Sequence, residues 1–420
     1  MKKSSLSKIA LFTNEERRKP MSYMSLSKIF YQDTHRYEEV YTQRYNSTVA
    51  KHFDIAIKQY NRKNSYPIFL NYTEDMMLLV EQIYKSYEKL LYSINIVPKV
   101  VLHQFALLSI LDEVQSTNAI EGVRSTRKEL KEILDGSASR SARFFTIVHK
   151  YNSLLTNEEF KFNTCQDIRT FYDAFAHEEI ANEEPNNKLD GTIFRKGSVD
   201  IASASGKTLH RGVSPESSII SMMEKSLSIL HDEKIPFLVR VSLFHYLFAY
   251  IHPFYDGNGR TDRFITTYFL SKHFHPVTAL RLSVIAKKNS RKYYSLFSEA
   301  DSEINRGDMT PFVLGFLELL LDTFNDTIII LERKQKQLKI YEEKILQLAL
   351  NDDILVNVYF ILLQAALFYG QGVSIEDIIK ITGKTRNTIQ KRLSAIPAEN
   401  ILVKKVHKTR YYRLNMLMFK

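Results

Sequence analysis

The sequence predicts a mainly α-helical protein. Glycine and proline, the residues that most often interrupt helices, number only 13 and 10 in 420 residues. Long apolar stretches lie between polar connections, and in several of them apolar side chains recur every three or four residues, as on one face of a helix. Apolar residues make up 44% and charged residues 25% of the chain, which is the balance of a globular protein with a large core.

Cysteine content and the length of the apolar runs limit the class of protein. Cys165 is the only cysteine, so we expect neither an intrachain disulfide nor a cysteine-based zinc site, and a reducing compartment fits. The apolar patch after Met1 is too short for a signal peptide, and no run approaches the ~18 apolar residues of a membrane span. We therefore expect a cytoplasmic protein that makes no use of a membrane.

Residues 1–97 are predicted to form an N-terminal helical region. Residues 1–60 are polar, rich in tyrosine and weakly patterned. Residues 73–94 carry apolar side chains at helical spacing and predict one long helix.

The next helix is expected over about residues 100–122. Pro98 suits the start of a helix, where its missing N–H costs nothing, and Gly122 suits the position just after the end. Glu121 then lies at the negative end of the helix, where a carboxylate is disfavoured unless a cation compensates it. The alternative is a solvated surface glutamate.

Residues 199–211 are the best hairpin candidate before residue 350. Val199–Ala202 and Thr208–Arg211 alternate around a turn at Ser203–Gly206. His210 is expected as a docking or surface residue. A strongly apolar helix should follow over residues 236–251, with His245 as a core histidine.

A polar loop of unusual composition separates this helix from the next one. It runs from His252 to Arg260 and holds an imidazole, a carboxylate, two glycines and an amide. Glycines allow close approach of the backbone to a ligand, and the first N–H groups of the following helix have no intrahelical partner. Together they predict an anion site suited to phosphate. Arg260 and Arg263 share one face of that helix and can bind further phosphate oxygens.

Two other side chains supply reactive groups to the same loop. Asp256 is a hard oxygen ligand of the kind that Mg²⁺ uses together with substrate phosphates, and His252 titrates near neutrality and can act as a general base. A base, a metal carboxylate and a phosphate cradle together indicate transfer of a phosphorus-containing group to a hydroxyl.

The string His-x-Phe-x-Asp-Gly-Asn-Gly-Arg-x-x-Arg at residues 252–263 resembles the Fic motif at every defining position. The resemblance implies a Fic fold and transfer of AMP from ATP to a protein hydroxyl, with His252 as the base and Asp256 as the Mg²⁺ ligand. A branch that transfers phosphate has lysine in place of Gly259, so glycine favours nucleotide transfer. The nucleotide-binding residues implied by the motif are Phe254 as loop anchor, Gly257, Asn258 and Gly259 as the anion hole, and Arg260 and Arg263 at the β and γ phosphates.

Three other segments are similar to parts of the same family. Thr117-x-x-x-Glu121-Gly122 resembles its inhibitory motif, whose glutamate pairs with the second motif arginine, here Arg263. The hairpin resembles the family's flap, which docks the target segment as an added strand. Tyr294 and Asn305 correspond to adenine contacts.

Residues 353–420 are predicted to form a separate C-terminal domain. A helix, a turn at Gly383, a second helix and a basic hairpin resemble a winged helix-turn-helix. This segment has eleven Lys or Arg and four Asp or Glu, and so carries +7 of the formal net charge of +11. Such a domain either contacts DNA or serves protein interaction and dimerisation.

The sequence therefore predicts a mainly α protein with a Fic core and a winged-helix tail. The predicted domains are residues 1–97, a Fic domain at 98–350 with its catalytic core at about 191–320, and residues 353–420. The expected function is a self-inhibited protein adenylyltransferase with ATP as substrate and Mg²⁺ as cofactor, acting on other proteins and on itself. The alternatives are AMP removal, alone or combined with transfer, a different nucleotide donor, and a DNA-binding regulator whose core senses nucleotide. A homodimer is also left open.

Overall fold

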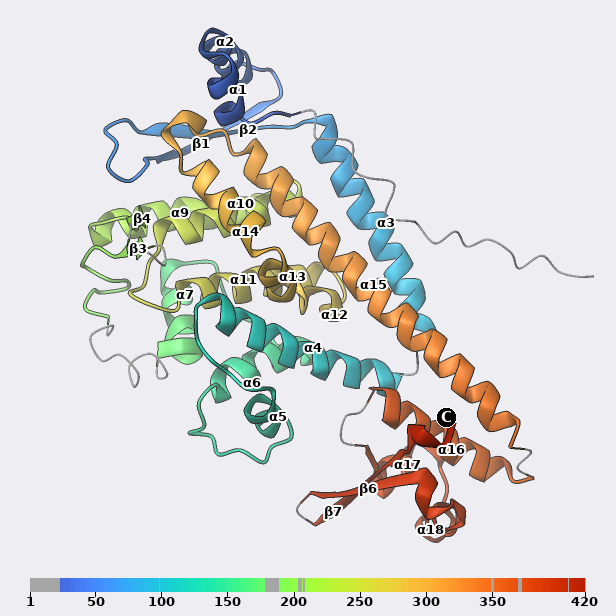
Figure 1. The fold of residues 1–420 in the computed structure, drawn as a ribbon. Coiled ribbons are helices and arrows are strands. Elements are labelled where there is room, and N and C mark those ends of the chain that lie inside the picture. Colours follow the sequence, from blue (N-terminus) through green and yellow to red (C-terminus); the bar gives the residue numbers. More distant parts are fainter. Residues whose placement is uncertain are drawn as a thin grey trace, which may run out of the picture.

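The structure, a computed structural model, describes residues 23–97, 99–177, 189–202, 206, 208–348, 351–368, 372–406 and 408–419. These residues are mainly helical and contain three small antiparallel sheets (Figure 1). The predicted fold class is thus confirmed. None of the helices in the described part of the chain is long and apolar enough to cross a membrane.

The N-terminal part combines two short helices with a pair of strands. Its elements are α1 (Leu26–Gln32), α2 (Thr34–Tyr45), β1 (Ala50–Ile57) and β2 (Tyr66–Asn71). In β1 the side chains of Phe53, Ile55 and Ile57 are buried and alternate with exposed ones, which is the period of a half-buried strand. The predicted helical region thus also contains a strand pair, which the sequence analysis did not predict.

Two long helices form the frame of the molecule. Helix α3 (Glu74–Ile96) lies alongside α15 (Thr310–Leu346), and both run diagonally across Figure 1. Pro311 occupies the first turn of α15, where its missing N–H costs nothing, and most of the N-terminal half of this helix is buried.

The centre of the fold lies on one side of this frame. Helix α10 is buried around its whole circumference, so its neighbours cover it on every side. The elements between α3 and α15 are α4 (Lys99–Ile120), α5 (Arg127–Leu134), α6 (Phe145–Ser153), η1 (Leu154–Thr156), α7 (Cys165–Tyr172), η2 (Asp173–His177), β3 (Asp200–Ala202), β4 (Thr208–Arg211), α9 (Glu216–His231), α10 (Phe237–Ile251), α11 (Asn258–His273), α12 (Pro276–Ala279), α13 (Leu282–Lys288), α14 (Ser290–Ala300) and η4 (Glu303–Asn305).

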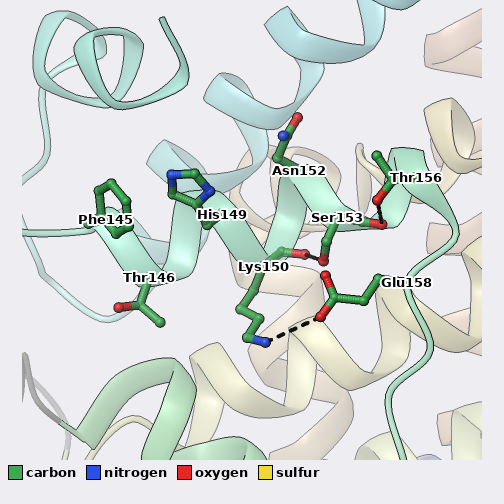
Figure 2. A pocket seen from close by; sticks show the side chains of 8 residues that line it. All are labelled: Phe145, Thr146, His149, Lys150, Asn152, Ser153, Thr156 and Glu158. Atoms are coloured by element: carbon green, nitrogen blue, oxygen red, sulfur yellow. Dashed lines mark hydrogen bonds and ion pairs between the residues drawn. The ribbon is translucent and has the colours of Figure 1, made fainter. Parts of the chain in front are cut away.

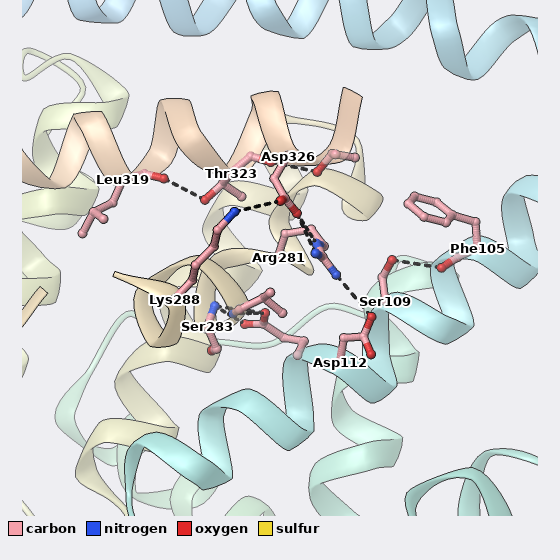
Figure 3. Close-up of polar contacts among 12 residues, drawn as sticks. Phe105, Ser109, Asp112, Arg281, Ser283, Lys288, Leu319, Thr323 and Asp326 are labelled. Carbon is pink, nitrogen blue, oxygen red and sulfur yellow. Dashed lines mark hydrogen bonds and ion pairs between the residues drawn. The ribbon is translucent and has the colours of Figure 1, made fainter. Parts of the chain in front are cut away.

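A buried polar network fixes α4 at its middle. Figure 3 shows Arg281 between Asp112 of α4 and Asp326 of α15, with N–O distances of 3.2 and 2.6 Å. Both carboxylate oxygens of Glu113, the next residue of α4, accept the backbone N–H of Ser283 at 2.9 Å. Burial raises the pKa of Glu113 to about 7 against the opposing effect of these hydrogen bonds. Helix α4 is thus tied to the start of α13 and to α15.

The C-terminal residues follow the order of elements predicted from the sequence. They form α16 (Asp353–Phe368), β5 (Val373–Ser374), α17 (Ile375–Thr382), α18 (Arg386–Ala395), η5 (Ala398–Asn400), β6 (Ile401–Val406), β7 (Thr409–Leu414) and η6 (Met416–Phe419), with β7 between β5 and β6 in an antiparallel sheet. Their apolar core also includes Val97 and Ile345, so this unit packs against the end of α15. The name winged helix and the domain boundary remain predictions.

Candidate active site

The site is built around a sharp bend at the end of α10. His252 caps this helix with φ 52° and ψ 62°, a left-handed conformation that costs free energy in any residue with a Cβ atom. Its N–H still donates to the carbonyl of Phe248 at 3.0 Å, and its side chain therefore leaves the helix axis at a defined angle. Contacts from other residues must therefore stabilise the backbone of His252 in this conformation.

A buried arginine that sequence reasoning missed holds the bend. The Arg195 guanidinium donates to the backbone carbonyls of His252 at 2.8 Å, Val213 at 2.9 Å and Ile251 at 3.3 Å. Its backbone N–H donates to the carbonyl of Pro253 at 3.2 Å. Arg195 is fully buried, and its positive charge lies at the negative end of α10, which favours it. No local motif marks this residue, because its partners are backbone carbonyls, and those of Ile251 and His252 lie more than fifty positions away in the chain.

The loop after His252 is closed by an aromatic stack and an amide. Phe254 is buried and stacks on Tyr172 with 3.6 Å between ring centroids. The side chain of Asn258 accepts the N–H of Phe254 and donates to its carbonyl, both at 2.8 Å. The predicted anchor role of Phe254 matches this packing. The Asn258 side chain is occupied inside the loop, which leaves its backbone N–H to face an anion.

The N-terminus of α11 presents the expected anion-binding arrangement. Gly257 caps this helix with φ 76°, a conformation that suits glycine, and the helix begins at Asn258. The N–H groups of Asn258, Gly259 and Arg260 belong to the first turn, where no intrahelical acceptor exists. The geometry thus provides a positive helix end directly beside the loop.

Asp256 and Arg260 lie together at the mouth of this helix end. The Asp256 carboxylate is half-exposed and lies 4.0 Å from the guanidinium of Arg260, which is almost fully buried. No cluster of three or more His, Cys, Asp or Glu side chains that could hold a metal occurs among the described residues. A single accessible carboxylate fits a Mg²⁺ ion whose other ligands come from substrate phosphates and water.

Arg263 joins the start of α11 to the end of α4. Its Nε donates to the Thr117 hydroxyl at 2.8 Å, and its Nη2 donates to the Thr117 carbonyl at 3.1 Å and to Glu121 Oε1 at 2.7 Å. The structure therefore brings together the two segments that resemble the Fic and inhibitory motifs, 142 positions apart in the chain. Burial would raise the pKa of Glu121, but Arg263 and Arg260 outweigh it and lower that pKa, so the carboxylate is ionised at neutral pH.

Two glycines make this contact sterically feasible. A Cβ atom on Gly259 would lie 2.1 Å from Glu121 Oε1 and 2.9 Å from the Arg263 guanidinium. Gly122 adopts φ 74° just after α4, and the N–H of Val123 returns to the carbonyl of Asn118 at 2.9 Å, as in a glycine C-cap. Glu121 consequently reaches the motif helix from the last turn of α4.

The two predicted adenine contacts have different environments. Tyr294 is half-exposed on α14, and its hydroxyl donates to the carbonyl of Ile120 at 3.1 Å, beside Glu121. Asn305 is fully buried, and its amide donates to the backbone carbonyls of Ala300 and Asp308 at 3.3 and 2.9 Å. Its prediction as an adenine contact is wrong in this structure, because the side chain closes a turn inside the core.

The hairpin of β3 and β4 is present and is fastened to the core by His210. The imidazole Nε2 lies 2.7 Å from the carbonyl of Tyr250, and Nδ1 lies 3.3 Å from the Asp301 carboxylate. Burial lowers the pKa of His210, but the hydrogen bond and charge of Asp301 more than offset this and raise it. The expectation of a surface residue is therefore wrong. Of the predicted turn at Ser203–Gly206, residues 203–205 lie outside the described residues.

The electrostatic surroundings keep His252 neutral. Burial and the nearby His210 and Arg195 lower the pKa of His252 to about 4, against the opposing charge of Glu121. A neutral imidazole can accept a proton at physiological pH. His245, by contrast, is a core residue as predicted, with Thr266 and Tyr293 at 2.9 Å from its two ring nitrogens.

A separate hollow lies on α6 and shares no residue with the motif loop (Figure 2). It has a volume of about 250 Å³, and an ion pair between Lys150 and Glu158 at 3.5 Å crosses it. Lys150 and Glu158, the charged residues that line it, compensate each other, so the chemistry described above does not extend to it.

Comparisons with known proteins agree with this geometry. Residues 165–270 match the profile of the family described as "Fic/DOC family". "Protein adenylyltransferase Fic" of Drosophila melanogaster and its Drosophila sechellia counterpart are each 30% identical over 125 residues, 30% of this chain and 23% of theirs. The match thus spans less than a quarter of these relatives. The crystal structure of a Fic family protein from Desulfovibrio desulfuricans G20 has a TM-score of 0.50 and 23% identity, covers 82% of this chain and 97% of that chain, and shows a similar fold.

Arg195→Lys tests the origin of the bend. Lysine keeps the charge but cannot donate to three carbonyls in one plane, so buried acceptors are left unpaired at a cost of ~1–3 kcal/mol each. We expect a lower free energy of unfolding by denaturant titration. Arg211→Lys on β4 is the matched control, because Arg211 is exposed and should change stability by less than ~0.5 kcal/mol. Equal stability of Arg195→Lys and wild type would contradict the assignment.

Proposed function

Because residues 165–270 form a Fic/DOC family domain, we propose that this chain is a protein adenylyltransferase that transfers AMP from ATP to a protein hydroxyl. The observation that carries the proposal is the convergence of a neutral imidazole, a free helix N-terminus, two arginines and one carboxylate within residues 252–263. Relatives named protein adenylyltransferase, 30% identical over 125 residues, support the proposal.

The proposed reaction assigns one task to each group. His252 accepts the proton of the target hydroxyl, whose oxygen then bonds to the α-phosphorus of ATP. The bond from the α-phosphorus to the oxygen bridging to the β-phosphate breaks, and pyrophosphate leaves with that electron pair. The first N–H groups of α11 bind the phosphate oxygens, and Arg260 and Arg263 bind the β and γ phosphates. Electrostatic stabilisation of this kind supplies much of the catalysis in phosphoryl-type transfers.

Asp256 is the residue that would hold Mg²⁺. The ion, when bound, neutralises negative charge on the phosphates and on the departing pyrophosphate. Asp256 itself is positioned by the loop, since the carbonyl of Asp256 accepts a hydrogen bond from Tyr172 at 3.1 Å. The Arg260 guanidinium lies 4.0 Å from this carboxylate.

The contact between Glu121 and Arg263 supports a proposal of self-inhibition. Arg263 is fully buried, and in this structure its charge is compensated by Glu121 and by the oxygens of Thr117. One guanidinium cannot direct the same N–H groups toward Glu121 and toward a γ-phosphate. Nucleotide bound while Glu121 remains in place is expected to adopt an unproductive position.

ATP labelled at the α-phosphate or at the γ-phosphate tests the function directly. Transfer of α-label but not γ-label to protein is the expected result, and His252→Ala should lower its rate by ~10²–10⁴-fold. Nucleotide binding by this variant should persist, because the helix end and arginines are intact. His149→Ala, an exposed histidine on α6, is the control and should remain active. Transfer at wild-type rate by His252→Ala would rule out the assigned base.

Release of AMP from premodified protein would support the removal reaction instead.

Glu121 and Arg263 should behave as a coupled pair. Glu121→Gly frees the guanidinium and should raise self-modification strongly, whereas Glu132→Gly near the end of α5 should not. Adding Arg263→Ala to Glu121→Gly should abolish the gain, because residues that share one interaction are non-additive. Incorporation of α-label is measured in wild type, both single variants and the double variant. No gain in Glu121→Gly, or a gain kept by the double variant, would contradict self-inhibition through this pair.

The pH at which activity falls on the acidic side should be far lower than it would be if the base were a histidine of ordinary pKa. Only the neutral imidazole accepts a proton, and with a pKa of about 4 it remains neutral at all pH values above 5. We therefore expect kcat/KM of Glu121→Gly to change little between pH 8 and about 5.5, where an unperturbed histidine of pKa ~6.5 would already be mostly protonated. A midpoint at or above pH 6.5 would show that the site does not depress the His252 pKa.

A further inference from the structure

The C-terminal unit contains a surface that the transferase chemistry does not use. Helices α17 and α18 are joined by a short turn in which Gly383 adopts φ 66° and Thr385 caps α18. Ile389 and Leu393 of α18 are buried against the core of this unit. Two helices joined by a tight turn, with the second packed through one apolar face, are the arrangement that presents a helix to the DNA major groove.

The exposed side of α18 carries side chains suited to reading base edges. Arg386, Asn387, Gln390 and Lys391 are exposed, and the helix contains no acidic residue. Arginine and lysine donate to guanine, and asparagine and glutamine pair with adenine in a bidentate manner. Glu376 of α17 contacts one guanidinium nitrogen of Arg386 at 2.8 Å and fixes the direction of that side chain. A protein-binding surface would instead require an apolar centre, which this helix face lacks.

The strand pair β6–β7 adds further positive charge, of which Lys404 interacts with the Asp135 carboxylate at the end of α5. Lys405 lies directly opposite Arg410 in the antiparallel register, and both are exposed, as are Lys404 and Lys408. Like charges in opposite positions destabilise a strand pair, and residues 401–414 include no aspartate or glutamate to relieve them. A polyanion bound along this ribbon would remove the repulsion. The ribbon and α18 belong to the same unit at the end of α15, remote from α10 and α11 in Figure 1.

We propose that residues 353–420 bind duplex DNA, with α18 in the major groove and the β6–β7 ribbon on the phosphate backbone. Duplex RNA fits less well, because its major groove is too deep and narrow for a helix to read. The charge of +7 in this segment agrees with a polyanionic partner. This binding is independent of AMP transfer, since none of its residues belongs to the loop at 252–263.

Fluorescence anisotropy of the full chain with a labelled mixed-sequence duplex, over a series of KCl concentrations, tests the ribbon. The test variant is Lys405→Gln with Arg410→Gln, and the matched control is Lys336→Gln with Lys339→Gln on exposed positions of α15. We expect salt-dependent binding by the wild type and the control. The ribbon variant should bind more weakly. A plot of log affinity against log salt concentration should also become less steep by roughly 2, because each lost phosphate contact removes about 0.9 from the slope. Retained transfer of α-label and an unchanged melting curve show that the ribbon variant is folded.

Selection from a random duplex library tests α18. The wild type should enrich a defined sequence, and Asn387→Ala with Gln390→Ala should lose this preference while keeping the salt dependence. Three results would each overturn the proposal. The first is absence of duplex binding at low salt, and the second is an equal loss of affinity in the ribbon variant and its α15 control. The third is binding to heparin that is as tight as binding to duplex. His252→Ala should bind DNA normally, so failure of this proposal and failure of the transferase assignment are distinguishable.

Discussion

A single buried guanidinium determines how the two halves of the site are arranged. Arg263 is almost completely removed from solvent, and a charge in that position is costly unless it is paired and hydrogen-bonded. Thr117 and Glu121 from the end of α4 provide this compensation. The position of α4 relative to α11 thus follows from the need to satisfy one cation. Phosphate oxygens are the natural replacement for the Glu121 carboxylate, because they satisfy the same charge.

Helix α4 is held more firmly in its middle than at its end. Asp112 and Glu113 tie the middle to Arg281 and to the N–H of Ser283, in contacts that involve buried or half-buried atoms. Glu121 follows the last regular turn and depends on one ion pair and a glycine cap. Burial strengthens the contacts in the middle, whereas the end remains partly open to water. The fold therefore combines a fixed helix with a replaceable terminal contact.

The parts predicted from the sequence were local in the chain or resembled a known motif. The start of α11 at Asn258 and the cap at Gly122 follow from residue types at adjacent positions. The pairing of Glu121 with Arg263 was expected only because two short motifs are known to occur together. Arg195, in contrast, acts through backbone carbonyls, including those of Ile251 and His252 more than fifty positions away, and no side-chain pattern reveals such partners.

Burial was the second property that sequence reasoning misjudged. His210 and Asn305 lie in polar surroundings in the sequence, yet tertiary packing covers both. The strand β1 was missed for the opposite reason, because charged and tyrosine-rich neighbours obscured its alternating apolar residues. Periodicity within ten residues predicts local structure, whereas the depth of a polar side chain depends on segments that pack over it from elsewhere.

Because Gly259 has no side chain, the contact between Glu121 and Arg263 is sensitive to mutation at position 259. Every glycine codon becomes an alanine codon by one base change, and the methyl group so introduced would occupy the space of the Glu121 carboxylate. The ion pair with Arg263 cannot keep its present geometry beside that methyl group. A single-base change at position 259 would therefore disturb the contact between Glu121 and Arg263 while leaving both of these residues unchanged.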